Sequence, residues 1–96
     1  MPDTEKFNLI SQMRRAVVSV ASNIVEGFTR RTLKDSLNFY NIARASLNEL
    51  EYQFLICKDL EYISQEEYDE VYKSCRITGA LIYKWAKSQQ LNYNNK

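Results

Sequence analysis

The chain has 96 residues and a formal net charge of +1, and 45% of its residues are hydrophobic and 26% are charged. A chain of this length forms one small domain that buries only about 60 to 65% of the surface its unfolded form exposes, and no apolar run reaches the roughly 18 residues that a membrane-spanning helix needs. Two glycines and one proline are too few turn formers for a many-stranded sandwich or barrel, so the expected fold class is all-α.

The first predicted helix covers residues 5–26. Its apolar residues recur at three- and four-residue steps, which is the spacing of an amphipathic helix. These residues are Leu9, Met13, Val17, Val20 and Ile24. Gly27 follows them, and a glycine at this place is typical of a helix that ends on a left-handed residue.

The second predicted helix covers residues 33–60 and has the strongest pattern in the sequence. Thr32 followed by Asp35 resembles a capping box, and the apolar residues after it keep a seven-residue repeat. The repeat consists of Leu33, Leu37, Tyr40, Ala43, Leu47, Leu50, Phe54 and Cys57.

The apolar arc of this second helix is wider than two neighbouring helices would cover. The residues that widen it are Phe39, Ile42, Leu55 and Ile56. Either a further helix, another copy of the chain or a different partner packs there, or these side chains complete a broad three-helix core.

The third predicted helix covers residues 65–90. Ser64 and Glu67 repeat the capping signature, and Lys84 and Lys87 lie toward the end of the helix, where its dipole favours positive charge. Its apolar stripe consists of Tyr68, Val71, Cys75, Thr78, Ile82 and Ala86.

Short connections make successive helices antiparallel neighbours. The predicted architecture is therefore an antiparallel up-and-down helical bundle of three long helices. We expect a single domain over residues 1–90 and a frayed polar tail over residues 91–96.

Two segments of the sequence resemble one protein family. The first is LISQMRRAVVSVASNIVEG, from Leu9 to Gly27, which the basic turn FTRR follows; the second is FYNIARASLNELEYQF, from Phe39 to Phe54. Both are similar to the four-helix-bundle proteins encoded by open reading frames in 23S rRNA intervening sequences, and to the related accessory variability determinant protein of diversity-generating retroelements. The resemblance covers about residues 2–90.

The resemblance implies a ring-like homopentamer of helical bundles with a basic surface, an assembly that would also cover the wide apolar arc. The sequence departs from the family at Ala21 and Ala45, where the family usually has proline and glycine. The family's first helix, which precedes the matched segment, has no counterpart here. Either the start of the chain is placed late, or the protein is a three-helix variant of the four-helix bundle.

The sequence predicts no active site. It contains no histidine, which removes the commonest general base and the commonest metal ligand. Cys57 and Cys75 are too few for a disulfide framework and are expected to be small core residues, and the chain opens without a secretory signal, so a reduced, cytoplasmic location is expected. We predict a non-enzymatic protein with no catalytic residue, no cofactor and no metal site.

Four basic residues are the candidate nucleic-acid contacts, namely Arg14, Arg30, Arg31 and Lys34. Arg30 and Arg31 precede the Thr32 N-cap, where their charge lies beside the positive end of a helix dipole and a bound phosphate would relieve the repulsion. Arg14 faces outward from the first helix. The alternative is that these side chains are simply solvated, as arginines in turns usually are.

A polar seam is predicted along the first helix. Ser22 and Glu26 share a face with Arg15, because eleven residues bring a helix back to almost the same direction. We expect Arg15 to pair with a carboxylate such as Glu49 on the neighbouring helix, and we favour this structural role over phosphate binding.

These observations favour a non-enzymatic, homo-oligomeric helical protein whose basic surface binds RNA or DNA through phosphate contacts. The alternative is a protein adaptor that uses its apolar arc to hold a partner, as the accessory variability determinant proteins hold a reverse transcriptase. Neither hypothesis involves a membrane.

Overall fold

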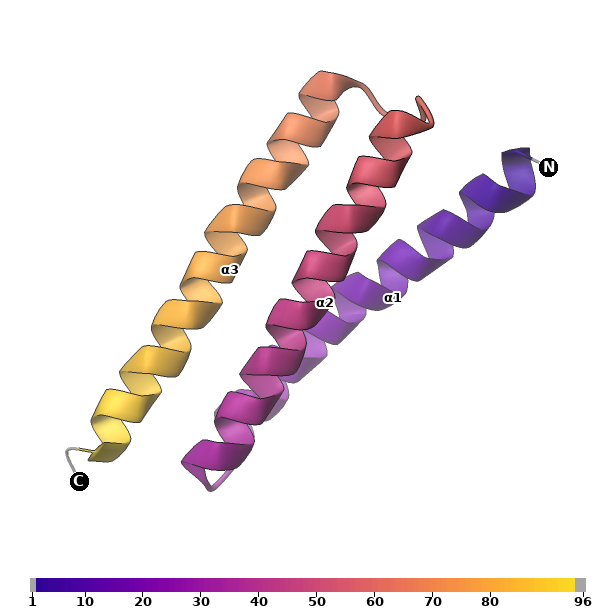
Figure 1. Cartoon of the computed structure of the whole chain (residues 1–96). Coiled ribbons are helices and arrows are strands. Elements are labelled where there is room, and N and C mark those ends of the chain that lie inside the picture. The colour runs from indigo at the N-terminus through magenta and orange to yellow at the C-terminus, as the bar shows by residue number, and fades with distance from the viewer. Residues whose placement is uncertain (1, 95–96) are drawn as a thin grey trace.

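The computed structural model describes residues 2–94, which form three antiparallel α-helices (Figure 1). They are α1 (Pro2–Thr29), α2 (Leu33–Asp59) and α3 (Gln65–Asn94), and the described residues contain no strand. The predicted all-α, up-and-down architecture is confirmed. Within this part of the chain, no helix combines the length and the apolarity that crossing a membrane requires.

The helices extend beyond several of their predicted ends. α3 continues to Asn94 instead of ending at residue 90, so residues 91–94 of the predicted frayed tail are helical. The physical reason is that no glycine or proline follows Gly79, and nothing in the sequence interrupts the helix. Residues 95–96 of that tail lie outside the described residues.

Gly27 does not end the first helix, contrary to the prediction. α1 continues through it to Thr29, and no glycine in the described chain has a positive φ. Gly27 is buried against the ring of Tyr40, and a Cβ atom built on it would lie 2.4 Å from Tyr40 Cε1. The missing side chain therefore lets α1 and α2 approach closely at the place where Tyr40 fills the core.

Local hydrogen bonds fix both ends of α2. The Thr32 side chain accepts a hydrogen bond from the backbone N–H of Asp35 at 3.2 Å, as the sequence predicts. At the other end, Glu61 has a φ of 63°, and the N–H of Tyr62 donates to the carbonyl of Cys57 at 2.9 Å. This is a Schellman motif, in which a left-handed residue, here not a glycine, turns the chain toward α3.

A reciprocal capping box begins α3. The Ser64 hydroxyl accepts a hydrogen bond from the N–H of Glu67 at 3.0 Å, and the Glu67 carboxylate accepts one from the N–H of Ser64 at 2.9 Å. Hydrogen bonding to Ser64, mainly by its backbone N–H, holds the pKa of Glu67 below its ordinary value of 4.5. The capping box therefore favours the charged form of this carboxylate.

The pH dependence of stability tests this capping box. The pKa of Glu67 is lower in the folded state than in the unfolded state. The Glu67 carboxylate therefore stabilises the fold at a pH above about 4.5, and this stabilisation is lost as the pH falls through the folded-state pKa. We expect the wild-type protein to be more stable than Glu67→Gln at pH 7, and this difference to shrink toward pH 3. Urea denaturation measures it, with Glu66→Gln as the matched control. A difference that does not change with pH would contradict the interpretation.

The hydrophobic core lies where α1 and α3 pack on α2. Its buried members are Val20, Tyr40, Ala43, Leu47, Cys75 and Ile82. At the edge of the core, the Tyr40 hydroxyl donates to Gln89 Oε1 at 2.7 Å, and Gln89 Nε2 donates to Ser36 Oγ at 3.0 Å. Since Ser36 and Tyr40 are both buried, this network ties α2 to the C-terminal half of α3.

The three helices do not close into a compact bundle. α1 and α3 each pack on α2 but hardly touch one another, and Figure 1 shows the N-terminal half of α1 diverging from the other helices. The radius of gyration is 15.8 Å, whereas a compact domain of 96 residues has about 12.5 Å. The exposed surface is 7055 Å², whereas a compact monomer of 11.3 kDa exposes about 5,700 Å².

Candidate functional site

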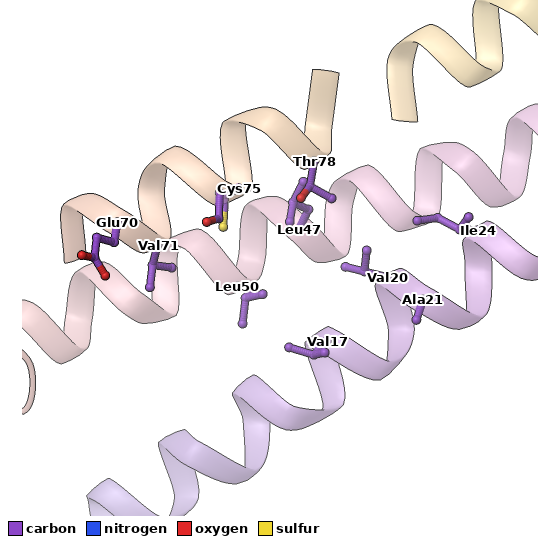
Figure 2. Close-up of a pocket in the computed structure, with 11 residues that line it drawn as sticks. Val17, Val20, Ala21, Ile24, Leu47, Leu50, Glu70, Val71, Cys75 and Thr78 are labelled. Atoms are coloured by element: carbon purple, nitrogen blue, oxygen red, sulfur yellow. The ribbon is translucent and has the colours of Figure 1, made fainter. Parts of the chain in front are cut away.

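An apolar groove lies between α1 and α3, above the surface of α2, and has a volume of about 510 Å³ (Figure 2). Its lining includes Val17, Val20, Ala21 and Ile24 from α1, Leu47 and Leu50 from α2, and Val71, Cys75 and Thr78 from α3. Figure 2 shows the α1 side chains across an open space from those of α3. α1 and α3 run in the same direction on either side of α2, and a space between two such helices is the shape that a further, antiparallel helix fills.

The walls of this groove continue into exposed apolar surface. In the described part of the chain, fifteen large hydrophobic residues are exposed, whereas nine hydrophobic residues are buried. Those exposed on α1 are Phe7, Ile10, Val17, Val18, Val25 and Phe28. An exposed apolar surface of this extent marks an interaction surface more often than a solvated one.

Aromatic contacts lie beyond Ile24 and Thr78, the last residues of α1 and α3 that line the groove. The ring of Phe28 lies 5.8 Å from the ring of Trp85 and 5.8 Å from the ring of Tyr40, measured between ring centres. The contact with Trp85 joins the C-terminal part of α1 to that of α3, and the contact with Tyr40 joins it to α2.

The wide apolar arc predicted on α2 is not the main unpartnered surface. Phe39, Leu55 and Ile56 are partly buried, and of the four residues only Ile42, at 40%, is exposed. α2 is the central helix and has neighbours on two sides. The exposed apolar surface lies mainly on α1 and α3, because each of these helices packs on α2 alone.

The predicted phosphate contacts at the turn between α1 and α2 differ in their availability. Arg30 forms an ion pair with Glu26, one turn earlier, and its guanidinium lies 4.6 Å from the ring centre of Phe39. Arg31 and Lys34 are exposed and form no ion pair with any residue of the described chain. The charge of Arg30 is thus already compensated, whereas Arg31 and Lys34 keep theirs available.

Arg14 lies apart from this cluster. It is exposed on α1, it does not line the apolar groove, and it precedes Arg30 by about 24 Å along the helix axis. One phosphate group cannot contact both positions. An extended nucleic-acid backbone can.

The predicted polar seam is divided in the structure. Glu26 is bound by Arg30, and Ser22 is exposed. Arg15 and Glu49 line the same small pocket between α1 and α2, but among the described residues no ion pair joins them. The structure therefore brings Arg15 and Glu49 near one another without the predicted contact.

A hydroxyl pair connects the two helices at this place. Ser19 of α1 and Ser46 of α2 form a hydrogen bond of 2.7 Å, and Asn23 donates to the Ser19 hydroxyl at 3.2 Å. Both serines line the pocket that Arg15 and Glu49 share. The short side chains make the contact between the helices, while the two long charged side chains remain exposed beside it.

A second groove, between α2 and α3, was not predicted from the sequence. Its volume is about 380 Å³, and its charged and aromatic lining residues are Arg44, Glu51, Arg76, Tyr83 and Lys84. One feature of the sequence could have indicated part of this groove. Tyr83 follows Arg76 by seven residues and Lys87 follows Tyr83 by four, and these steps place the three residues on one face of a helix. Which residues of α2 lie opposite them depends on how the two helices pack, and the spacing of residues within one helix does not reveal this packing.

The cysteines are structural. Cys57 and Cys75 are both free and buried, which confirms the prediction that they are small core residues. Burial raises the pKa of both thiols, and this disfavours the reactive thiolate at neutral pH. In residues 2–94, no three cysteine or carboxylate side chains gather closely enough to hold a metal ion.

Comparison with known proteins gives a consistent result. The family model described as 23S rRNA-intervening sequence protein matches residues 1–84. The fold is similar to the crystal structure of a protein of unknown function from the S23 ribosomal protein family of Bacteroides thetaiotaomicron, with a TM-score of 0.78 and 28% sequence identity over 82% of this chain and 70% of that chain. No curated protein matches the sequence.

Proposed function

Because this chain belongs to the family of 23S rRNA-intervening sequence proteins, we propose that it is a non-enzymatic helical subunit that assembles with further copies of itself and binds RNA or DNA through phosphate contacts. Assembly buries the groove between α1 and α3. It also brings the basic residues of several copies onto one surface, where they act together on a nucleic-acid backbone.

The open apolar groove is the observation that carries this proposal. The chain exposes about 1,350 Å² more than a compact monomer of its mass, which is more than the roughly 800 Å² that each partner buries in a standard interface. Most soluble oligomers consist of identical subunits. We infer that further copies of the chain cover the groove.

The charge distribution supports nucleic-acid binding. Residues 6–48 carry seven basic and only two acidic side chains, and six of the seven basic ones form no ion pair in the described chain. Arg14, Arg31 and Lys34 belong to this group, and the start of α2 adds the positive end of a helix dipole. Such cations bind phosphates with an affinity that falls steeply with salt and depends little on base sequence.

The salt dependence of RNA binding tests the role of Arg31 and Lys34. The slope of the logarithm of the binding constant against the logarithm of the salt concentration counts phosphate contacts, and each contact contributes about 1. For a fluorescein-labelled RNA hairpin, we expect this slope to become less steep by about 2 when both residues are replaced by glutamine. Fluorescence anisotropy between 50 and 200 mM KCl measures the slope. The double variant Lys6→Gln with Arg15→Gln removes the same charge elsewhere and should bind like the wild type. An unchanged slope in the first double variant would contradict the proposal.

A second candidate function is a protein adaptor. The observation that favours it is the same groove, since an apolar surface between two helices also accepts a helix from a different protein. Under this alternative, substitutions in the groove abolish capture of the partner, whereas substitution of Arg31 and Lys34 leaves it unchanged.

A further inference from the structure

We propose that the groove between α2 and α3 binds single-stranded nucleic acid, through phosphates on its cations and a base stacked beside Tyr83. This inference rests on the proposed function, and it specifies the binding site and that the ligand is single-stranded. Leu47 and Cys75 line both this groove and the apolar one, so the contact between α2 and α3 separates the two. Assembly through the apolar groove therefore leaves this site open.

The charges of the groove favour an anion. Glu51 is the only carboxylate among its lining residues, and Arg76 binds that carboxylate at 2.9 Å. Arg44 and Lys84 line the groove as well, are exposed, and form no ion pair in the described chain. Lys87, one turn beyond Tyr83, adds a third uncompensated cation. The ion pair of Arg76 with Glu51 is neutral, so the remaining cations leave the groove with a net positive charge.

An aromatic ring lies among these cations. Tyr83 is 50% exposed, and the charged groups of Arg44 and Lys87 lie 5.7 and 5.9 Å from its ring centre. Bases in unpaired strands stack on tyrosine rings and on arginine guanidinium planes, and the phosphates beside them bind lysine and arginine. A half-exposed ring with two cations within about 6 Å therefore offers both kinds of contact that an unpaired nucleotide makes.

The floor of the groove allows close approach of a flat ligand. Gly79 and Ala80 lie between the flanking charged residues, and Ala80 is exposed. Gly79 has no side chain and Ala80 has only a methyl group, so neither residue obstructs the groove that Tyr83 lines. A duplex keeps its bases stacked on one another and cannot offer one to this ring, so the geometry favours an unpaired strand.

Two substitutions of the groove floor test the inference. Ala80→Glu places a carboxylate among the cations, and Ala80→Gln adds a side chain of the same size without the charge. We expect Ala80→Glu to weaken binding of a fluorescein-labelled, unstructured 15-nucleotide RNA at least about 10-fold, and Ala80→Gln to weaken it less than about 3-fold. Because Ala80 is exposed, both variants should fold, which circular dichroism verifies.

Substitutions of Tyr83 test the stacking separately from the charge. We expect Tyr83→Leu to weaken binding of the same RNA by about 5- to 100-fold, because the ring is lost, and Tyr83→Phe to change it less than about 2-fold. Binding of a 15-base-pair RNA duplex should change less than about 3-fold in either variant. Equal affinities of the leucine and phenylalanine variants for the single strand, or equal losses for strand and duplex, would overturn the inference.

The outcomes separate this inference from the proposed function. If RNA binding responds to replacement of Arg31 and Lys34 but not to Ala80→Glu, the proposed function stands and the site between α2 and α3 is wrong. If the unaltered protein binds neither RNA at 50 mM KCl, the proposed function fails, and this inference fails with it.

Discussion

Replacing Gly27 with alanine will destabilise the protein by about 1 to 3 kcal/mol, the cost of forcing extra volume into a packed core. Helix propensity alone predicts the opposite effect on stability, because alanine favours a helix over glycine by about 1 kcal/mol. The new Cβ would lie 2.4 Å from Cε1 of Tyr40. That ring cannot move aside freely, because it is only 1% exposed and its hydroxyl is hydrogen-bonded to Gln89.

The second glycine of the chain supplies the control. A Cβ on Gly79 would meet Leu47 at 3.4 Å, an ordinary contact, so Gly79→Ala should stabilise the protein by about 0.5 to 1 kcal/mol. Urea denaturation of both variants measures the difference. If Gly27→Ala were as stable as Gly79→Ala, the close approach of α1 and α2 at Tyr40 would be wrong.

Replacing Val17 with glutamate will prevent the assembly that we propose. Val17 lines the apolar groove and is 52% exposed in the single chain, so a carboxylate there remains solvated in a monomer. In an assembly that covers the groove, the same carboxylate would be buried without a partner, which costs several kcal/mol. We therefore expect the dissociation constant of the assembly to rise at least about 100-fold, while the helical content is unchanged.

Ser22→Glu is the matched control for this substitution. Ser22 lies on the same helix and is exposed, but it does not line the groove. Sedimentation equilibrium of the two variants over a range of concentrations measures their association. If Val17→Glu assembles as strongly as Ser22→Glu, copies of the chain do not meet through the groove.

The helices could be predicted because their signals are local. The Thr32 cap and the Ser64–Glu67 capping box depend on residues within one turn, and the structure confirms both. Gly27 could not be assigned in this way. Whether a glycine ends a helix or admits a neighbouring ring depends on the position of Tyr40, thirteen residues later and on another helix.

The candidate site was less predictable for the same reason. The ion pair of Arg30 with Glu26 joins residues four positions apart, a spacing that the sequence shows. The contact of the Arg30 guanidinium with the ring of Phe39 joins it to the next helix, and the sequence does not show this contact. The contact of Arg44 with Tyr83 joins residues of two helices and has no local signal. Periodicity likewise placed Val17 on an apolar stripe but could not show that nothing covers it.

The two grooves suggest a division of roles between the faces of the chain. The apolar groove has the surface of an interface, whereas the groove between α2 and α3 has cations and a half-exposed ring. The central helix contributes to both. A substitution that disturbs α2 is therefore expected to affect assembly and nucleic-acid binding together, and the exposed positions Val17 and Ala80 are needed to separate them.

The central claim is that the open groove makes this chain a subunit, and its mass in solution tests that claim most directly. Size-exclusion chromatography with light scattering at about 10 to 100 μM should give a defined multiple of 11.3 kDa. A single species of 11.3 kDa across that range, unfolding cooperatively as a monomer, would contradict the account.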